Sequence, residues 1–410
     1  MSRPFTANER TYVPPPRPVV VVCLDGSPDK YLDAALSRDR MPRLQAMIDR
    51  GYRGQARAAL PSFTNTNNVS IVTGLPPSGH GISGNFFLDP ETGEEVMMNS
   101  PRYLRAETIF AVASRAGCRV ATVTAKDKLR EMFAAGMDGI SFSAERANEA
   151  QRATHGIDDV EKLVGAPTPE VYSAEASLFV LRAGVALLER ELADFVYLST
   201  TDFIQHKHNS TDPVALEFYA AIDAELGRLF DCGAIVGVTS DHGMNAKQTS
   251  DGTPNVIYLE SILAEDFGSD VRVILPITDP YVVHHGALGS FAMVYAKNLY
   301  QADEMLPHVI MLDGVTEVYG RSEAAEKLEL PADRIGHLVV LAGRDCVIGR
   351  RPEDHDVTHV AAGLRSHGGR EEEVVPFILS EPLNQEYAKR ATGDVRNFDI
   401  FDFTVNGTAG

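Results

Sequence analysis

Short apolar runs recur along the first part of the chain, and most of them end at a polar or charged residue. The clearest runs cover residues 18–24, 119–125, 195–200 and 236–239. Runs rich in valine and other β-branched residues, without polar alternation, are typical of buried strands in a parallel sheet. A shorter strand is predicted at residues 54–60.

Segments of helical pattern separate these strands. At residues 41–51, four apolar residues recur at helical spacing and a glycine ends the helix. Residues 213–230 form a second predicted helix, and the polar cluster at residues 61–68 opens a third that runs toward Val72. The alternation of strand and helix predicts an α/β fold with a mostly parallel central sheet and helices on both faces.

The pattern changes after Pro254. Short strand-like runs follow without regular helical crossovers, at residues 271–275, 281–283, 290–295 and 337–341. We therefore expect residues 253–354 to form an inserted α+β cap domain over the edge of the sheet. Residues 1–252 and 355–410 then form the core, whose pattern returns near residues 365–369. The tail at residues 395–410 shows no strong motif.

A glycine-rich hexapeptide at residues 79–84 (GHGISG) has the spacing of a dinucleotide-binding loop. Such a loop follows a strand and opens a helix, whereas this one follows Pro76 and Pro77. The sequence therefore predicts an ordinary loop at this position.

The composition indicates a large hydrophobic core and argues against nucleic acid as a partner. With 410 residues, 44% of them hydrophobic, the chain can bury a large core and more than one domain. A net charge of -19 argues against a nucleic-acid partner, because phosphate contacts need clustered lysine and arginine. It is compatible with a small anionic substrate, since bound divalent metals reverse the local field at a site.

The sequence indicates neither secretion nor a membrane. Residues 1–18 are polar and proline-rich, unlike a signal peptide, and no apolar run reaches the roughly 18 residues of a membrane span. Cys23, Cys118 and Cys232 lie in or beside strand-like runs and show no CxxC spacing, which predicts buried thiols. We expect a soluble cytoplasmic protein without membrane contact, and a homodimer is left open.

Acidic and histidine side chains gather at the predicted ends of the strands. Ligands of open α/β sheets collect at the carboxyl edge of the strands, so these side chains are expected to lie together. The set comprises Asp25, Asp202, His206, Asp241, His242 and His367. Three carboxylates and three imidazoles, without cysteine, suit two divalent ions better than one. Zn2+ is the expected metal, with Mn2+ or Fe2+ as alternatives.

The spacing within this set favours one histidine over another. Asp202 and His206 stand at i and i+4, which puts both on one face of a helical turn, whereas His208 points elsewhere. Taken singly, a strand-end aspartate is more often a helix N-cap, and a histidine is more often a satisfied core residue. The metal prediction therefore depends on the joint placement of all six residues.

In their order along the chain, these residues resemble the alkaline phosphatase superfamily, most closely its nucleotide pyrophosphatase/phosphodiesterase branch. The resemblance covers most of the chain outside the cap and implies an alkaline phosphatase-like core. It is carried by Asp25, the helix start at Thr64, residues 73–82 (TGLPPSGHGI), Asp202 with His206, residues 240–243 (SDHG) and residues 366–368 (SHG).

The resemblance also implies roles for individual residues. One metal would be held by Asp25, Thr64, Asp241 and His242, and the other by Asp202, His206 and His367. Thr64 would be the nucleophile, and Asn85 would bind a non-bridging oxygen of the phosphoryl group. The chemistry agrees, because a threonine hydroxyl needs a metal to favour the alkoxide, and two ions about 4 Å apart provide that. By local pattern alone, Thr64 would be an N-cap and Asn85 a turn residue.

Lys126 and Lys128 stand at the end of the strand predicted at residues 119–125. At i and i+2 they can point into one crevice, although an exposed basic patch is the simpler interpretation. Two cations at a helix start oppose the helix dipole, so an anion is expected to compensate. Residues 123–129, residues 84–87 and the length of the cap resemble the carbon–phosphorus hydrolases of the superfamily. That resemblance implies that both lysines hold the carboxylate of a small anionic phosphonate substrate.

The implied function is metal-dependent hydrolysis of a carbon–phosphorus bond through a phosphothreonine intermediate. A phosphodiesterase or pyrophosphatase would share every metal ligand but would need room for an alcohol or nucleotide group. A cofactor-independent phosphosugar mutase would return the phosphoryl group to its substrate. A catalytically silent binding protein is disfavoured, because the nucleophile and the ligand set are all present. In the cap, His284 and His285 are expected to be structural or exposed.

Overall fold

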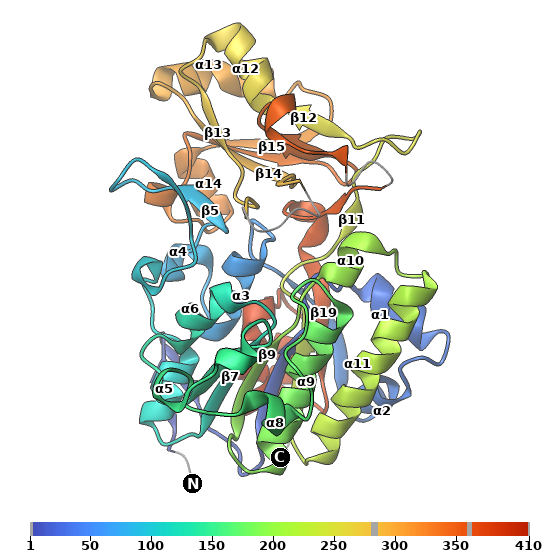
Figure 1. Ribbon diagram of the computed structural model, residues 1–410. Helices are drawn as coiled ribbons and strands as arrows, with labels where there is room; N and C mark the ends of the chain where they lie inside the picture. Colours follow the sequence, from blue (N-terminus) through green and yellow to red (C-terminus); the bar gives the residue numbers. More distant parts are fainter. Residues whose placement is uncertain (1–2, 280–285, 359–362, 409–410) are drawn as a thin grey trace.

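The computed structural model describes residues 3–279, 286–358 and 363–408. A seven-stranded sheet forms the centre of one part of the molecule, and a smaller four-stranded sheet lies beyond its edge (Figure 1). The predicted strand at residues 281–283, His284 and His285 fall outside the described residues.

The large sheet has the strand order β4-β19-β10-β3-β9-β7-β8. Its strands are β3 (Val19–Cys23), β4 (Tyr52–Arg57), β7 (Val120–Thr124), β8 (Ile140–Ser143), β9 (Phe195–Ser199), β10 (Ile235–Thr239) and β19 (Val374–Leu379). The five strands from β10 to β8 pair in parallel, whereas β19 runs antiparallel to β10 and β4. The prediction of a mostly parallel central sheet in an α/β fold is confirmed.

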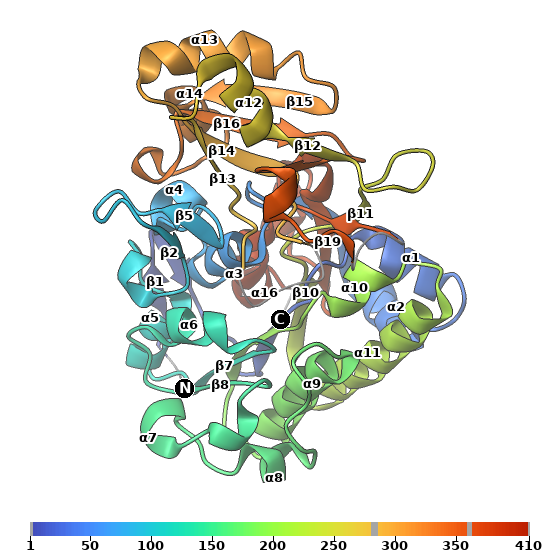
Figure 2. The same cartoon turned by 45° about the horizontal axis from the view of Figure 1, so that its top comes forward.

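The strands are apolar on both faces because helices cover both. Val20 and Val22 of β3 pack into one hydrophobic cluster, and Val19, Val21 and Cys23 pack into another. In both views α1, α2 and α11 lie on one side of the molecule and α5 and α6 on the opposite side (Figure 1 and Figure 2).

The helices divide between these two clusters. The first cluster includes residues of α1 (Asp29–Leu36), α2 (Pro42–Arg50), α8 (Val160–Val164), α9 (Ala174–Glu189), α10 (Phe203–Lys207) and α11 (Pro213–Asp231). The second includes residues of α3 (Thr64–Thr73), α5 (Ile109–Arg115), α6 (Arg130–Ala134), α15 (Gln385–Arg390) and α16 (Ile400–Asn406). The buried helix α16 lies in the tail where the sequence showed no motif.

The smaller sheet is antiparallel, with the order β13-β14-β16-β15. Its elements are β13 (Arg272–Ile274), β14 (Phe291–Tyr295), β15 (Val315–Gly320) and β16 (Leu338–Ala342), with α12 (Leu259–Phe267), α13 (Leu299–Val309) and α14 (Arg321–Lys327). Three of these strands were predicted and β15 was not. The sequence showed no regular helical crossovers between these strands, but α13 and α14 flank β15. Their helical period is hard to read, since α13 contains Pro307 and α14 has only 7 residues.

Short elements complete the chain. They are β1 (Phe5–Ala7), β2 (Arg10–Tyr12), α4 (Pro77–His80), β5 (Phe86–Leu88), β6 (Glu95–Met97), α7 (Arg152–His155), β11 (Asn245–Ala246), β12 (Val256–Tyr258), β17 (Val347–Gly349) and β18 (Arg365–Ser366). The loop predicted at residues 79–84 therefore begins inside α4. Cys23 and Cys118 are buried as predicted, but Cys232 is only half-buried.

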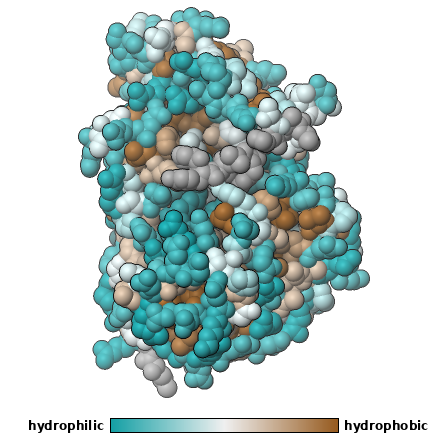
Figure 3. Space-filling view, viewed as in Figure 1, coloured by the Kyte–Doolittle hydropathy of each residue, from teal (hydrophilic) through white to brown (hydrophobic). Residues whose placement is uncertain are grey.

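The surface agrees with this layered core. On the face shown in Figure 3, hydrophilic residues cover most of the surface and hydrophobic residues form separate patches. Among the helices that the structure describes, none combines the length and apolar character needed to cross a bilayer.

Candidate active site

Three neighbouring parallel strands deliver carboxylates to one edge of the large sheet. Asp25 follows β3, Asp202 follows β9 and Asp241 follows β10, and each is at most 3% exposed. The turn after β3 requires Gly26, whose φ is +64° and where a Cβ would lie 2.7 Å from Cβ of Asp202. The parallel sheet thus concentrates three acidic groups within one buried volume.

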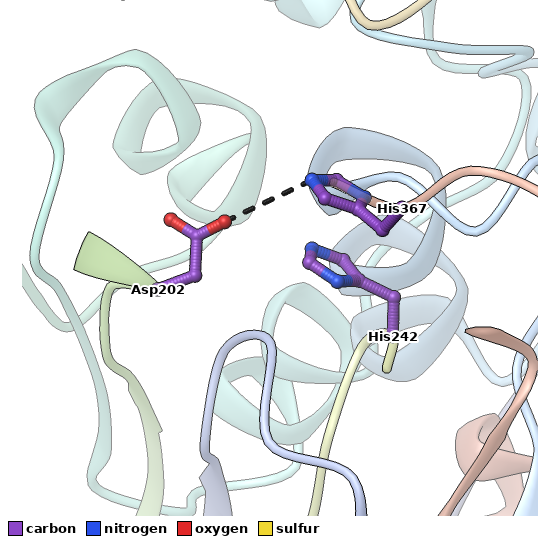
Figure 4. Close-up of side chains that lie close together, drawn as sticks. All are labelled: Asp202, His242 and His367. Atoms are coloured by element: carbon purple, nitrogen blue, oxygen red, sulfur yellow. Dashed lines mark ion pairs between the residues drawn. The ribbon is translucent and has the colours of Figure 1, made fainter. Parts of the chain in front are cut away.

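Histidines complete two groups of potential ligands around these carboxylates. One ligand atom from each of Asp25, Asp241 and His242 lies within 4.8 Å of the others, and the same holds for Asp202, His242 and His367. Figure 4 shows both imidazoles on the same side of Asp202, with Nε2 of His367 3.8 Å from its Oδ2. The two rings stack with their centroids 3.5 Å apart.

The sixth predicted ligand joins from α10. Nε2 of His206 lies 2.9 Å from Oδ2 of Asp202, whereas His208 is turned toward Asp212, with Nδ1 and Oδ2 3.1 Å apart. Asp202 occupies the N-cap position of α10, but its side chain makes no capping hydrogen bond. Its carboxylate therefore faces the cluster of histidines rather than the helix backbone.

The three histidines share one arrangement that suits metal ligation. In each ring Nδ1 lies 2.8 Å from a backbone carbonyl: that of Arg365 for His206, Gly243 for His242 and Ser62 for His367. A carbonyl only accepts, so Nδ1 carries the proton. Nε2 then presents a lone pair, which is the usual tautomer of a metal-bound histidine.

The carboxylates also fit a cation. Oδ1 of Asp25 and Oδ1 of Asp202 are buried and accept no hydrogen bond from the described residues. Nε2 of His242 lies 3.2 Å from the first of these oxygens, and Nζ of Lys126 lies 3.6 Å from the second. Oxygen and imidazole ligands in this number suit divalent ions such as zinc.

The pKa values reflect crowding of negative charge. Burial, with the charges of Asp202 and Asp241, raises the pKa of Asp25 to about 8. Burial lowers the pKa of His242, but Asp241 and Asp25 outweigh it and raise that pKa to about 10. Burial and the neighbouring His242 and His206 hold the pKa of His367 well below its usual range. Divalent cations would offset this excess of negative charge.

Thr64 lies at the first position of α3, beside this cluster. The N-cap is Phe63, so the hydroxyl of Thr64 does not cap its own helix. Its Oγ1 lies 3.4 Å from Nε2 of His242, and the residue is 8% exposed. The N-terminus of a helix presents N–H groups and a positive dipole end, which favours a phosphoryl group at this position.

Asn85 is held next to the same helix end. Its Oδ1 accepts a hydrogen bond from the backbone N–H of Asn65 over 3.0 Å. Its own backbone donates to Pro276 O over 2.8 Å and accepts from Met98 N over 2.7 Å. With Oδ1 engaged, the amide NH2 group of Asn85 is the part that can donate to an anion near Thr64.

Asn68, which sequence reasoning missed, connects the helix that carries Thr64 to the cluster of aspartates and histidines. Its Nδ2 donates to Oδ2 of Asp241 over 3.1 Å and to the carbonyl of Thr64 over 3.0 Å. Its Oδ1 accepts from the hydroxyls of Tyr197 and Ser199, both at 2.7 Å. The run of polar residues at the start of α3 was the available signal, but the partners of each residue depend on the fold.

Lys126 and Lys128 follow β7 and line a cavity of about 360 Å3 beside the cluster. Burial lowers the pKa of Lys126, but Asp202 and Asp25 outweigh it, so the net shift is upward. Nζ of Lys128 lies 2.8 Å from Oδ2 of Asp279, a residue that the sequence did not indicate. Two half-buried ammonium groups therefore stand at one end of the site, with the carboxylates and histidines at the other.

Comparison with protein families gives one match over most of the chain. Residues 19–370 match the model of the type I phosphodiesterase / nucleotide pyrophosphatase family. An uncharacterised pyrophosphatase/phosphodiesterase of Schizosaccharomyces pombe is 37% identical over 84 residues, which are 20% of this chain and 16% of that protein. The chain thus matches less than a fifth of the length of this curated relative.

Solved structures extend the similarity to the whole chain. Two crystal structures of phosphonoacetate hydrolase from Sinorhizobium meliloti 1021, in complex with phosphonoformate and with phosphonoacetate, are 46% identical to this chain. They superpose with a TM-score of 0.94 and cover 100% of both chains. Murine ectonucleotide pyrophosphatase/phosphodiesterase 5, at 18% identity, a TM-score of 0.63 and 96% of both chains, shares the fold.

Proposed function

This chain belongs to the type I phosphodiesterase / nucleotide pyrophosphatase family, and on that premise we propose that it cleaves the carbon–phosphorus bond of phosphonoacetate to acetate and phosphate. The whole-chain match to the Sinorhizobium enzyme carries this proposal. The paired lysines support it, because they place two cations beside the ligand cluster, where the carboxylate of such a substrate would lie.

The ligand cluster supports a two-metal enzyme. Asp25, Thr64, Asp241 and His242 would hold one divalent cation. Asp202, His206 and His367 would hold the other. Zinc suits this mixture of imidazole and carboxylate best, with Mn2+ or Fe2+ as alternatives. When bound, the two cations would lower the pKa of the attacking hydroxyl groups and stabilise negative charge on the phosphoryl oxygens.

Thr64 acts as the nucleophile in the first half of the reaction. Its deprotonated Oγ1 attacks phosphorus, so that an O–P bond forms while the C–P bond breaks on the opposite side. Asn85 donates an amide N–H to a non-bridging oxygen, and the N-terminus of α3 faces the same group. The products of this step are phosphothreonine and a carbanion of acetate.

Lys126 and Lys128 stabilise the leaving group. The electron pair of the broken bond stays on the CH2 carbon and delocalises into the adjacent carboxylate. Two ammonium groups at that carboxylate attract it most strongly in the transition state, where its negative charge is greatest. The carbon then takes a proton from water, and acetate leaves.

The second half of the reaction restores the enzyme. The water that gave its proton to the carbon attacks phosphorus as hydroxide, the bond between Thr64 Oγ1 and phosphorus breaks with its electron pair on Thr64, and phosphate leaves. Asp202, His206 and His367 surround the position from which this water attacks. Over the whole cycle one water is consumed: its proton ends on the acetate carbon and its oxygen on phosphorus.

Three further features belong to the same proposal. Residues 253–354, which contain the four-stranded sheet, act as a cap over the site. The cytoplasm is the proposed compartment, because Cys23, Cys232 and Cys346 form no disulfide, as a reducing environment favours. The homodimer stays a prediction, which light scattering during size-exclusion chromatography tests.

A phosphodiesterase or pyrophosphatase is the second candidate, favoured by the family match. It would use the same cluster and Thr64 but would not need two half-buried lysines at the leaving-group end. The metal-loaded protein should be incubated with phosphonoacetate, phosphonoacetaldehyde and a nitrophenyl phosphodiester, with phosphate, acetate and nitrophenol assayed. Release of equal amounts of acetate and phosphate supports the proposal, whereas release of nitrophenol alone supports the second candidate.

A further inference from the structure

One loop of the smaller sheet contacts residues at both ends of the site. Residues 275–279 leave β13 and form a turn in which Thr278 N donates to Leu275 O over 2.9 Å. Within this loop, Pro276 O accepts from the backbone N–H of Asn85 over 2.8 Å. Asp279 accepts from Lys128 over 2.8 Å. The loop therefore touches the residue proposed for the phosphoryl group and one proposed for the carboxylate.

The contact at the phosphoryl end is tight. A Cβ added to Gly84 would lie 2.5 Å from Cβ of Pro276, so only glycine lets the two segments approach this closely. The position of Asn85 along its strand-like segment is thus fixed relative to the loop.

The contact at the carboxylate end joins two nearly buried charges. The side chain of Lys128 is 14% exposed and that of Asp279 is 4% exposed. An ammonium group has three N–H donors on a flexible four-carbon chain, so its direction is set by its partners. Within the described parts of the chain, the structure shows a single hydrogen bond for Lys128, the one to Asp279. Within the described residues, Asp279 therefore uses one of the three donors of this ammonium group.

Lys126 is held differently. Its nearest acidic partner is Asp202, at 3.6 Å, which belongs to the ligand cluster itself. Asp279 lies outside that cluster and contacts the substrate end of the site through Lys128. Its carboxylate therefore affects the ammonium without changing the ligand set.

We propose that Asp279 is a positioning residue, whose carboxylate holds the ammonium of Lys128 where the carboxylate of the substrate binds. This inference rests on the proposed function, since it concerns the carboxylate end of phosphonoacetate. Because one loop holds both Asn85 and Lys128, it also sets the separation between the two ends of the bound substrate. Without Asp279, the lysine side chain turns toward other acceptors and the carboxylate loses one of its two cations.

Two variants of similar size separate positioning from other roles. Asp279→Asn keeps an oxygen that accepts a hydrogen bond from Lys128, whereas Asp279→Leu removes it. Asp279→Leu should lower kcat/KM for phosphonoacetate at least tenfold, the usual effect of losing a hydrogen bond to a charged group. Asp279→Asn should stay within about threefold of the wild-type value, by the same argument.

Binding measurements and a double variant sharpen the test. Asp279→Leu should weaken inhibition by phosphonoformate, which carries a carboxylate, and leave inhibition by inorganic phosphate unchanged. In a Lys128→Met background, Asp279→Leu should cause no further loss, because Asp279 acts through that lysine. The value of an inhibition constant does not depend on the absolute rate of phosphonoacetate turnover, so it can be measured in a slowed variant, and an unchanged phosphate constant shows that the variant is folded.

Contrary outcomes are distinct from failure of the proposed function. If the wild-type protein releases no acetate from phosphonoacetate, the proposed function is wrong. If it does release acetate, the inference is overturned by an Asp279→Leu variant with unchanged selectivity for phosphonoformate. It is equally overturned by tighter binding of phosphonoformate, which would mean that Asp279 competes with the substrate, or by an added loss in the Lys128→Met background.

Discussion

Asn68 donates a hydrogen bond from Nδ2 to Oδ2 of Asp241 over 3.1 Å, across 173 positions of the chain. Oδ1 of Asp241 already accepts the backbone N–H groups of Gly26 and His242, over 3.2 Å and 3.0 Å. The helix that carries Thr64 is thereby tied to the end of β10. This relationship fixes the orientation of one proposed metal ligand relative to Thr64.

The first prediction concerns this contact. Asn68→Leu removes the donor that orients Asp241 while keeping a similar volume. Loss of a hydrogen-bond partner behind a metal ligand typically weakens metal binding by about 10- to 100-fold. Competition titration against a zinc chelator measures this change directly. Asn67 supplies the control, because it lies on the same helix and bonds the backbone of Ala59 instead. Asn67→Leu should destabilise the fold but leave zinc affinity unchanged, and equal losses would contradict the assigned role.

The second prediction concerns the pH dependence of stability. Burial, with a smaller effect of Arg334, lowers the pKa of His80 from 6.5 to about 3. Its ring nitrogens contact Ser70 Oγ at 2.8 Å and Ile82 N at 3.1 Å. Between pH 6.5 and 3 the unfolded chain binds a proton that the folded protein does not, so stability falls as the pH falls. His80 alone contributes a slope of about 1.4 kcal/mol per pH unit in this window.

Denaturant unfolding at several pH values measures this slope. His80→Gln should lower stability at neutral pH, because a buried ring is lost. Between pH 6 and 4, the free energy of unfolding of this variant should fall less steeply with pH than that of the wild-type protein. The difference in slope corresponds to about one bound proton. Identical slopes for the two proteins would show that His80 does not cause the decline.

The site residues that could be predicted are those with a local signal. Asp25, Asp202 and Asp241 each follow an apolar run, and the spacing of His206 from Asp202 follows from one turn of helix. Parallel pairing of β10, β3 and β9 then brings these residues together, which is a general property of such sheets.

The residues that sequence reasoning missed have no local signal that identifies their partners. Asn68 looks like one more polar residue in an asparagine-rich turn, and its role appears only when Asp241 packs beside it. Asp279 meets Lys128 across 151 positions, from a different sheet. In the same way, β15 has one exposed and five half-buried residues, and its sequence shows neither an apolar run nor clear alternation.

The third prediction concerns the metals. With six protein ligands and Thr64 in one buried cluster, the purified protein should contain about two zinc-like ions per chain. Chelation should abolish activity, and Zn2+, or else Mn2+ or Fe2+, should restore it. Elemental analysis checks the stoichiometry. One ion or none in fully active protein would exclude the two-metal scheme.

The fourth prediction concerns the nucleophile. Thr64→Ala removes only a hydroxyl and a methyl group, so the fold should persist, as circular dichroism and a melting curve can show. Turnover should fall by several orders of magnitude, because the covalent route is lost. Thr64→Ser restores a hydroxyl and should recover part of the rate. A Thr64→Ala protein that retains at least a tenth of the wild-type rate would remove Thr64 from this role.

The last prediction concerns the paired lysines, which separate a carbon–phosphorus hydrolase from a phosphodiesterase. Replacing Lys126 or Lys128 with alanine leaves Thr64 and all the ligands in place. The loss should therefore fall on phosphonoacetate and largely spare a nitrophenyl phosphodiester, which has no carboxylate. Removal of a charged donor from a site with little water typically costs about two to three decades in kcat/KM.

Part of that loss should appear in kcat, because the departing group carries more negative charge on its oxygens than the bound carboxylate does. Methionine at either position is the matched control, because it has a similar length but no charge. It should lower activity on phosphonoacetate as much as alanine does, since the charge rather than the packing of the lysine is required. Steady-state kinetics of each variant with phosphonoacetate and with the nitrophenyl phosphodiester test this prediction. Equal losses on phosphonoacetate and on the phosphodiester would mean that the lysines support the site in general, and the phosphodiesterase assignment would then replace the hydrolase one.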